Sequence, residues 1–153
     1  MIIPDANLLL YAFDVRSLWH VEARKWLESA FAGPELIGLP WQSVYAFLRI
    51  ATDPRIAGMQ CPMGLAVEVV QGWLRQPKVR MLNPGERHWR LLQEMLVEGQ
   101  VKGPMVTDAQ LAALTMEYGG VLYTNDRDFA RFPGCAGSIR WLGNKRCADS
   151  RSG

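Results

Sequence analysis

Residues 119–129 read GGVLYTNDRDF, and this stretch decides the predicted fold. The glycine pair is typical of a helix end, and Val121–Thr124 has the aromatic and β-branched composition of a short buried strand. Carboxylates follow at once, at Asp126 and Asp128. In an open α/β sheet a ligand binds beyond the carboxyl ends of the strands, so we interpret both carboxylates as candidate site residues.

The alternation of short apolar runs and amphipathic segments extends outward from this stretch. Apolar runs at 1–3, 36–39, 79–82 and 139–142 are predicted strands, and helical spacing marks 8–13, 20–31, 41–51, 63–74 and the segment around Trp89, Leu92 and Leu96. A further helix is predicted to be capped at Thr107, because Thr107-Asp108-Ala109-Gln110 matches a capping box. This order predicts an α/β fold with a central, mainly parallel sheet and helices on both faces.

Length and composition are those of one globular domain. The chain has 153 residues, of which 49% are hydrophobic and 21% charged. We expect a folded domain over 1–142 and a basic, flexible C-terminal tail over 143–153. The formal net charge of +2 excludes nucleic-acid binding by bulk charge alone, although a local basic groove remains open.

Membrane and secreted classes are not expected. No apolar stretch reaches the roughly 18 residues of a membrane helix, and residues 1–5 lack the basic region of a secretory signal. Three cysteines (Cys61, Cys135 and Cys147) match no metal-ligand or redox spacing. We therefore expect a cytoplasmic protein with reduced thiols.

Carboxylates follow apolar runs at three places in the chain. Asp5 ends the first run, Asp126 and Asp128 follow the run at 121–124, and Asp108 opens a helix after the short apolar pair Met105-Val106. If the strands are neighbours, these carboxylates converge, and such a cluster needs a cation to stay ionised. Oxygen ligands favour Mg²⁺ or Mn²⁺ over zinc.

Each carboxylate also has an ordinary structural explanation. Asp5, Asp126 and Asp128 are common turn residues. Asp108 stabilises the dipole of a helix when it lies in the first turn. The interpretation as a site therefore depends on their joint occurrence at the ligand edge of one sheet.

The three acidic segments together resemble a known family. Asp5-Ala6-Asn7 after the first strand, then residues 106–114 (VTDAQLAAL), then residues 122–129 (LYTNDRDF) are similar to PIN-domain ribonucleases, and more narrowly to the VapC-type toxins of bacterial toxin–antitoxin pairs. The similarity runs from about residue 1 to 142. It includes the less diagnostic segments at 39–41, 47–52 and 128–133.

The resemblance implies an activity, a cofactor and partners. It implies an Mg²⁺-dependent endoribonuclease, with Mn²⁺ as a substitute, that hydrolyses RNA through metal-activated water. It also implies a homodimer and a VapB-like antitoxin that blocks the active site. Asp5, Asp108 and Asp126 match the family's metal-binding acids, with Asp128 as a nearby catalytic member. Supporting roles fall to Asn7, Thr107 and Thr124.

One departure from the family pattern leaves a second function open. The family usually has a further acid on the helix that corresponds to 41–51, where this chain has Tyr45, Ala46 and Phe47. Asp53, at the end of that helix, is a candidate substitute for the missing acid. A catalytically weak PIN-like module that binds RNA or protein therefore remains an alternative. A receiver-like phosphoacceptor domain fits less well, because it needs a lysine after a late strand.

A cluster of acids repels RNA, so basic residues are expected beside it. We name Arg127 and Arg131 beside the last acidic segment and Arg49 near the centre of the chain, and expect binding that weakens with salt. The six tryptophans are interpreted as core or interface residues, although base stacking is possible. His20 and His88 are expected on the surface or on a helix face, outside any catalytic triad.

Overall fold

The structure is a computed structural model, and it describes residues 1–135 and 139–141. Within them, the strands are β1 (Ile2–Pro4), β2 (Ile37–Pro40), β3 (Val79–Leu82), β4 (Val121–Thr124) and β5 (Ile139–Trp141). The helices are α1 (Ala6–Phe13), α2 (His20–Ala32), α3 (Trp41–Ala51), α4 (Met63–Leu74), α5 (His88–Glu98), α6 (Met105–Glu117) and the short 3₁₀ helix η1 (Arg127–Arg131). The predicted tail at 143–153 lies outside the described residues.

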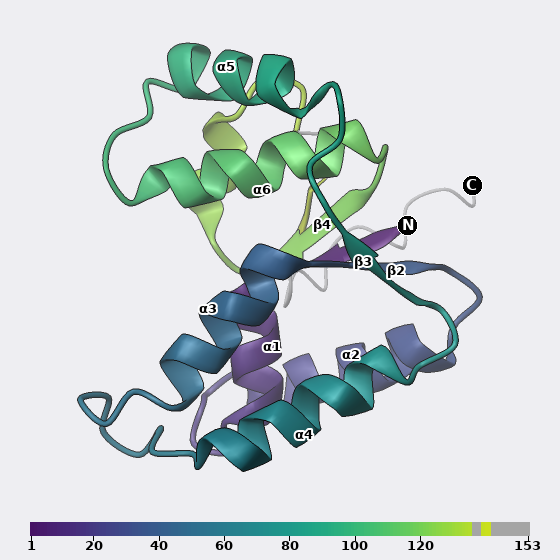
Figure 1. Cartoon of the computed structure of the whole chain (residues 1–153), viewed down its shortest axis with the longest axis vertical. Helices are drawn as coiled ribbons and strands as arrows, with labels where there is room; N and C mark the ends of the chain where they lie inside the picture. Colours follow the sequence, from purple (N-terminus) through teal and green to yellow (C-terminus); the bar gives the residue numbers. More distant parts are fainter. Residues whose placement is uncertain (136–138, 142–153) are drawn as a thin grey trace, which may run out of the picture.

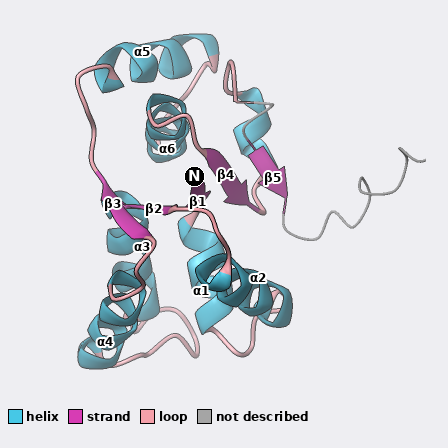
Figure 2. Ribbon diagram, turned by 90° about the vertical axis from the view of Figure 1, so that its right-hand side faces the viewer, coloured by secondary structure: helices cyan, strands magenta, loops and turns pink. Residues whose placement is uncertain are grey.

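All pairings in the sheet are parallel, and the strand order is β3-β2-β1-β4-β5. Figure 1 shows α5 and α6 on one face of the sheet and α1 to α4 on the other, and Figure 2 shows the same layers from the side. The predicted fold class, a parallel sheet with helices on both faces, is confirmed.

Successive side chains of β1 enter two separate cores, because neighbouring residues of a strand point to opposite faces. Ile2 packs into the core under α1 to α4, which includes Phe47 and Trp73. Ile3 packs into the core under α5 and α6, which includes Leu114 and Phe129. The first strand is therefore buried on both faces, and Asp5, the polar residue that follows it, lies at the edge of the sheet.

The start of α6 differs from the prediction. The helix begins at Met105 after Pro104, and no side chain caps it, so the predicted cap at Thr107 is wrong. Met105 and Val106 are helical and do not form a short strand. Asp108 still lies in the first turn, as predicted. At the other end, Gly119 has a φ of 59°, and this left-handed conformation turns the chain into β4.

The described helices include none that is both long enough and apolar enough to cross a membrane.

Candidate active site

Parallel register brings the ends of β1 and β4 together. Ile3 lies beside Leu122 and Pro4 beside Tyr123, so the next residues, Asp5 and Thr124, meet at the sheet edge. The Thr124 hydroxyl donates to Asp5 Oδ2 at 2.8 Å. The same hydroxyl accepts the backbone N–H of Asp126 at 2.9 Å. One buried threonine thus joins two candidate acids that are far apart in the sequence.

Asp5 is a buried carboxylate, with a relative exposure of 7%. Burial raises its pKa above the usual value, and the charge of Asp126 raises it further. The Thr124 hydroxyl opposes this shift, as do the amides of Ala6 and Asn7, although neither amide forms a full helix-capping hydrogen bond. A cation bound beside Asp5 would therefore stabilise the ionised form of its carboxylate.

Asp108 reaches the same place from α6. Its partial burial raises its pKa to about 6, and the charges of Asp126, Asp5 and Asp128 add to the effect. Arg131 lowers this pKa. The other three predicted acids are thus within electrostatic reach of Asp108, and Arg131 is a cation near it.

Asp126 and Asp128 come from the turn after β4. Asp126 caps η1, because its Oδ1 accepts the backbone N–H of Asp128 at 2.8 Å. The Asp128 side chain is 60% exposed and lies 3.8 Å from Arg131. Asp128 is the outermost of the four acids and has the weakest structural claim to bind an ion.

The predicted RNA-binding arginines and Asp53 are exposed or are paired with other residues. Arg127 is exposed on η1. Arg49 is exposed in the last turn of α3, and its charge acts on Asp53. Asp53 is itself held by Arg55 at 2.8 Å, which lowers its pKa to about 2. The structure therefore ties the suggested substitute acid to its own arginine.

The first turn of α3 contributes two residues that the sequence analysis missed. Gln42 Nε2 donates to the carbonyl of Thr107 at 3.2 Å, next to Asp108. The buried Ser43 hydroxyl donates to the carbonyl of Pro4 at 3.3 Å, next to Asp5. Both follow β2 at the ligand edge, so the rule that identified Asp5 also pointed to this turn.

Carboxylate oxygens are suitable ligands for a divalent cation, but the acid side chains are not arranged around one point. Across 1–135 and 139–141, no three His, Cys, Asp or Glu side chains form a group that could hold a metal ion as they stand. The candidate donors are all carboxylate oxygens whose mutual repulsion raises the pKa of Asp108. A hard divalent cation relieves such repulsion. Coordination would require side chains to turn inward or to bind through water.

The histidines lie apart from these acids. His20 is half-buried, with Nδ1 3.0 Å from the carbonyl oxygen of Tyr11. His88 lies on the buried side of α5, so the helix-face expectation holds for it and the surface expectation does not. Its Nδ1 is 3.3 Å from Glu117 Oε2 across the α5–α6 layer, but neither ring nitrogen has a hydrogen-bond partner among the described residues.

The Thr124 hydroxyl is expected to matter for stability. In Thr124→Val the buried Asp5 carboxylate loses its donor, so the free energy of unfolding should fall by about 1–3 kcal/mol. Urea denaturation at pH 7 measures this change. Thr124→Ser retains the hydroxyl and should lose less. Equal stability of the valine variant and the unsubstituted chain would contradict the role given to this hydrogen bond.

Similarity to known proteins agrees with this geometry. The PIN domain family matches residues 2–134. Ribonuclease VapC33 of Mycobacterium tuberculosis is 39% identical over 132 residues, which cover 86% of this chain and 92% of that protein. Ribonuclease VapC37 of the same organism is 36% identical over 141 residues, which cover 92% of this chain and 95% of that protein.

Solved structures share the fold at lower identity. VapBC2 from Rickettsia felis, bound to a promoter DNA fragment, matches with a TM-score of 0.69 and 14% identity, over 92% of this chain and 98% of that one. Mycobacterium tuberculosis VapC20, described as a sarcin-ricin loop cleaving toxin, matches with a TM-score of 0.66 and 18% identity, over 85% of this chain and 93% of that one. The chain belongs to the PIN-domain family and, within it, to the VapC ribonucleases.

Proposed function

We propose that this chain is a metal-dependent endoribonuclease that acts as the toxin of a toxin–antitoxin pair in the cytoplasm. The observation that carries the proposal is the proximity of Asp5, Asp108 and Asp126 beyond the ends of β1 and β4: the Thr124 hydroxyl joins Asp5 to the backbone of Asp126, and the charges of Asp5 and Asp126 add to the raised pKa of Asp108. Its family membership supports the same reaction class.

Asp5, Asp108 and Asp126 are proposed to hold Mg²⁺, with Mn²⁺ as a substitute. When bound, such an ion lowers the pKa of water and neutralises charge on the phosphate. Thr124 orients the Asp5 carboxylate through their hydrogen bond. Asp128 lies at the rim, where it can accept a proton from water or orient it, and Arg131 faces the phosphate groups of the RNA.

The proposed partners are a VapB-like antitoxin and a second copy of this chain. Similar structures include toxin–antitoxin complexes from Rickettsia felis and Salmonella typhimurium. Exposed apolar side chains on α4 (Met63, Leu65 and Val67) and in the α1–α2 loop (Val15 and Leu18) give this chain surface for such contacts.

Cleavage of an RNA pool tests the reaction. The purified chain is incubated with structured and unstructured RNA in Mg²⁺, in Mn²⁺ and in a chelator. We expect internal cleavage with either ion and none with the chelator. The alternative, an RNA-binding module without catalysis, is favoured by the lack of a carboxylate at 45–47. Binding without cleavage in either ion would support that alternative.

Arg131 should contribute to RNA affinity through charge. In a chain made inactive by Asp108→Asn, the added change Arg131→Ala should weaken binding and reduce the slope of log K against log salt by about one. Arg75→Ala, an exposed arginine at the end of α4, serves as the control. Fluorescence anisotropy across a salt series measures both. An unchanged slope would remove Arg131 from the RNA-binding surface.

A further inference from the structure

Two aromatic rings lie exposed on the first turns of α3. Trp41 and Tyr45 are four residues apart, which places them on the same side of a helix. Their ring centroids are 5.7 Å apart and their planes differ by 29°. Trp41 is 37% exposed and Tyr45 62%. The pair therefore offers a large, partly stacked aromatic surface to solvent.

Other tryptophans of the chain are used differently. Trp73 is buried and packs edge-on against Phe47, with centroids 4.7 Å apart. Trp26 packs against Tyr123 at 5.0 Å. The expectation that the tryptophans serve the core thus holds for these two. Trp41 belongs to neither of the main cores under the sheet.

Hydrogen bonds from residues beside Trp41 connect the first turn of α3 to the segments that carry the acids. Gln42, next to Trp41, bonds the carbonyl of Thr107 and so links this turn to the start of α6. Ser43 bonds the carbonyl of Pro4 and links it to the end of β1. Because β2 lies beside β1 in the sheet, Trp41 emerges at the same edge as Asp5.

We propose that Trp41 and Tyr45 form a stacking platform for an unpaired base of the RNA strand that enters the acidic site. The inference rests on the proposed ribonuclease function and deepens it. Acidic side chains repel the phosphate backbone, so a contact with a base that does not depend on charge adds affinity beside Arg131 and the metal ion. Stacking of a base on aromatic rings is such a contact, and it accepts any base.

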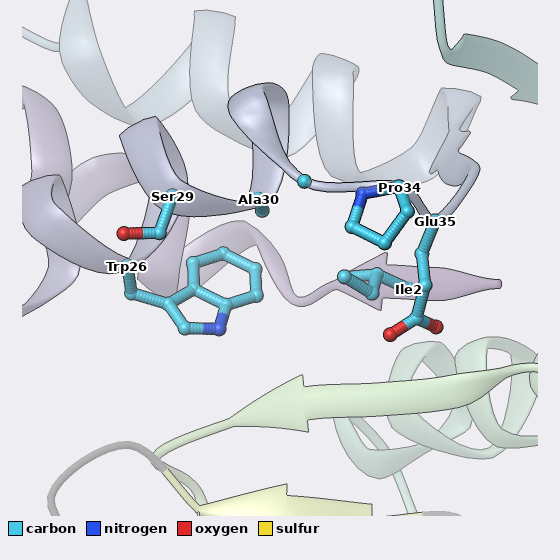
Figure 3. Close-up of a pocket in the computed structure, with 7 residues that line it drawn as sticks. Ile2, Trp26, Ser29, Ala30, Pro34 and Glu35 are labelled. Carbon is cyan, nitrogen blue, oxygen red and sulfur yellow. The ribbon is translucent and has the colours of Figure 1, made fainter.

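The surroundings favour RNA over a protein at this position. The exposed apolar side chains of α4 (Met63, Leu65 and Val67) lie on a helix that carries none of the four acids. Trp41 and Tyr45 instead lie on α3, whose Gln42 bonds the carbonyl of Thr107, the residue before Asp108. Two pockets among the described residues lie away from the aromatic pair. One is lined by Ile2, Trp26, Pro34 and Glu35 near the amino end of β1 (Figure 3), and another lies between α1 and the α3–α4 loop.

RNA binding in the Asp108→Asn background tests the platform with Mg²⁺ present. A labelled, unpaired oligoribonucleotide is titrated by anisotropy. Trp41→Ala should weaken binding roughly fivefold to a hundredfold, and Tyr45→Ala should act in the same direction. Trp41→Phe should recover most of the affinity. Trp89, which is 63% exposed on α5, supplies the control Trp89→Ala, and this change should leave binding unaltered.

Two further readouts separate stacking from a structural effect. The salt slope should stay the same in Trp41→Ala, because no phosphate contact is lost. An oligonucleotide with an abasic site at the stacked position should bind the background chain weakly. The Trp41→Ala substitution should not weaken the binding of this abasic oligonucleotide any further, because the base on which the ring would stack is already missing. Melting temperatures establish that each variant is folded.

Unchanged RNA affinity in both alanine variants would overturn the platform. If these variants instead altered dimer mass or antitoxin binding, the rings would belong to a protein interface. A background chain that binds no RNA would also overturn it. Cleavage by the unsubstituted chain, measured separately, decides the ribonuclease proposal, so the two failures are distinguishable.

Discussion

Asp108→Asn should lower the rate of RNA cleavage by about three orders of magnitude while the chain stays folded. The substitution keeps the size of the side chain and removes the charge that would hold the ion. Charge stabilisation by a metal ion contributes several kcal/mol to a transition state, and each 1.36 kcal/mol corresponds to a factor of ten in rate. Single-turnover cleavage of a labelled RNA in Mg²⁺ measures the effect.

Asp53→Asn provides the matched control for this loss. Asp53 follows the helix on which the family usually carries an acid, but its charge is directed to Arg55. The control should cleave RNA at close to the unsubstituted rate. If Asp53→Asn were inactive and Asp108→Asn active, the residues assigned to the site would be wrong.

Mg²⁺ should raise the melting temperature of the chain at pH 7 by roughly 5–10 °C when its concentration is about one hundred times the dissociation constant. Binding to the folded state alone adds about 2.7 kcal/mol under that condition. For a chain of this size, each kcal/mol shifts the melting temperature by roughly 2–4 °C. Differential scanning calorimetry with and without chelator measures the shift.

The pKa of Asp108 gives this stabilisation a pH dependence with a definite sign. The usual value is 3.8 and the folded chain raises it to about 6. Between these values the folded chain binds more protons than the unfolded chain, so without metal the free energy of unfolding falls as pH rises. The raised pKa of Asp5 acts in the same direction. Mg²⁺ should therefore stabilise the chain at pH 7 and have little effect near pH 4.

Without metal, in chelator, the Asp108→Asn variant should be more stable than the unsubstituted chain. Removing a repelled charge should stabilise the folded chain at pH 7 by about 1 kcal/mol, once screening by solvent is allowed for. The same variant should gain little from added Mg²⁺. A variant that is less stable than the unsubstituted chain in chelator, and equally stabilised by Mg²⁺, would contradict repulsion among these acids.

Local patterns in the sequence were enough to predict the layers of the fold. The apolar spacing at 41–51 and the run at 79–82 match α3 and β3. The rule that ligands bind beyond strand ends identified Asp5 and Asp126, and the parallel register places both at one edge. These features depend on residues that are near in sequence or on the topology common to such sheets.

One feature that sequence reasoning missed is local, and the others depend on contacts between residues far apart in the sequence. The start of α6 follows Pro104 without a side-chain cap, so the capping-box pattern at Thr107 misled the prediction. Gln42 and Ser43 bond partners 65 and 39 residues away. The buried His88 lies 3.3 Å from Glu117, which belongs to a different helix. Local periodicity carries no information about such pairs.

A crystal of the chain soaked in Mn²⁺, with data collected for anomalous scattering, tests the central claim most directly. A manganese peak is expected at the carboxyl ends of β1 and β4, bound directly or through water by Asp5, Asp108 and Asp126. The peak should be absent in crystals of Asp108→Asn. A chain that cleaves RNA with Mn²⁺ but holds the ion at other residues would contradict the account.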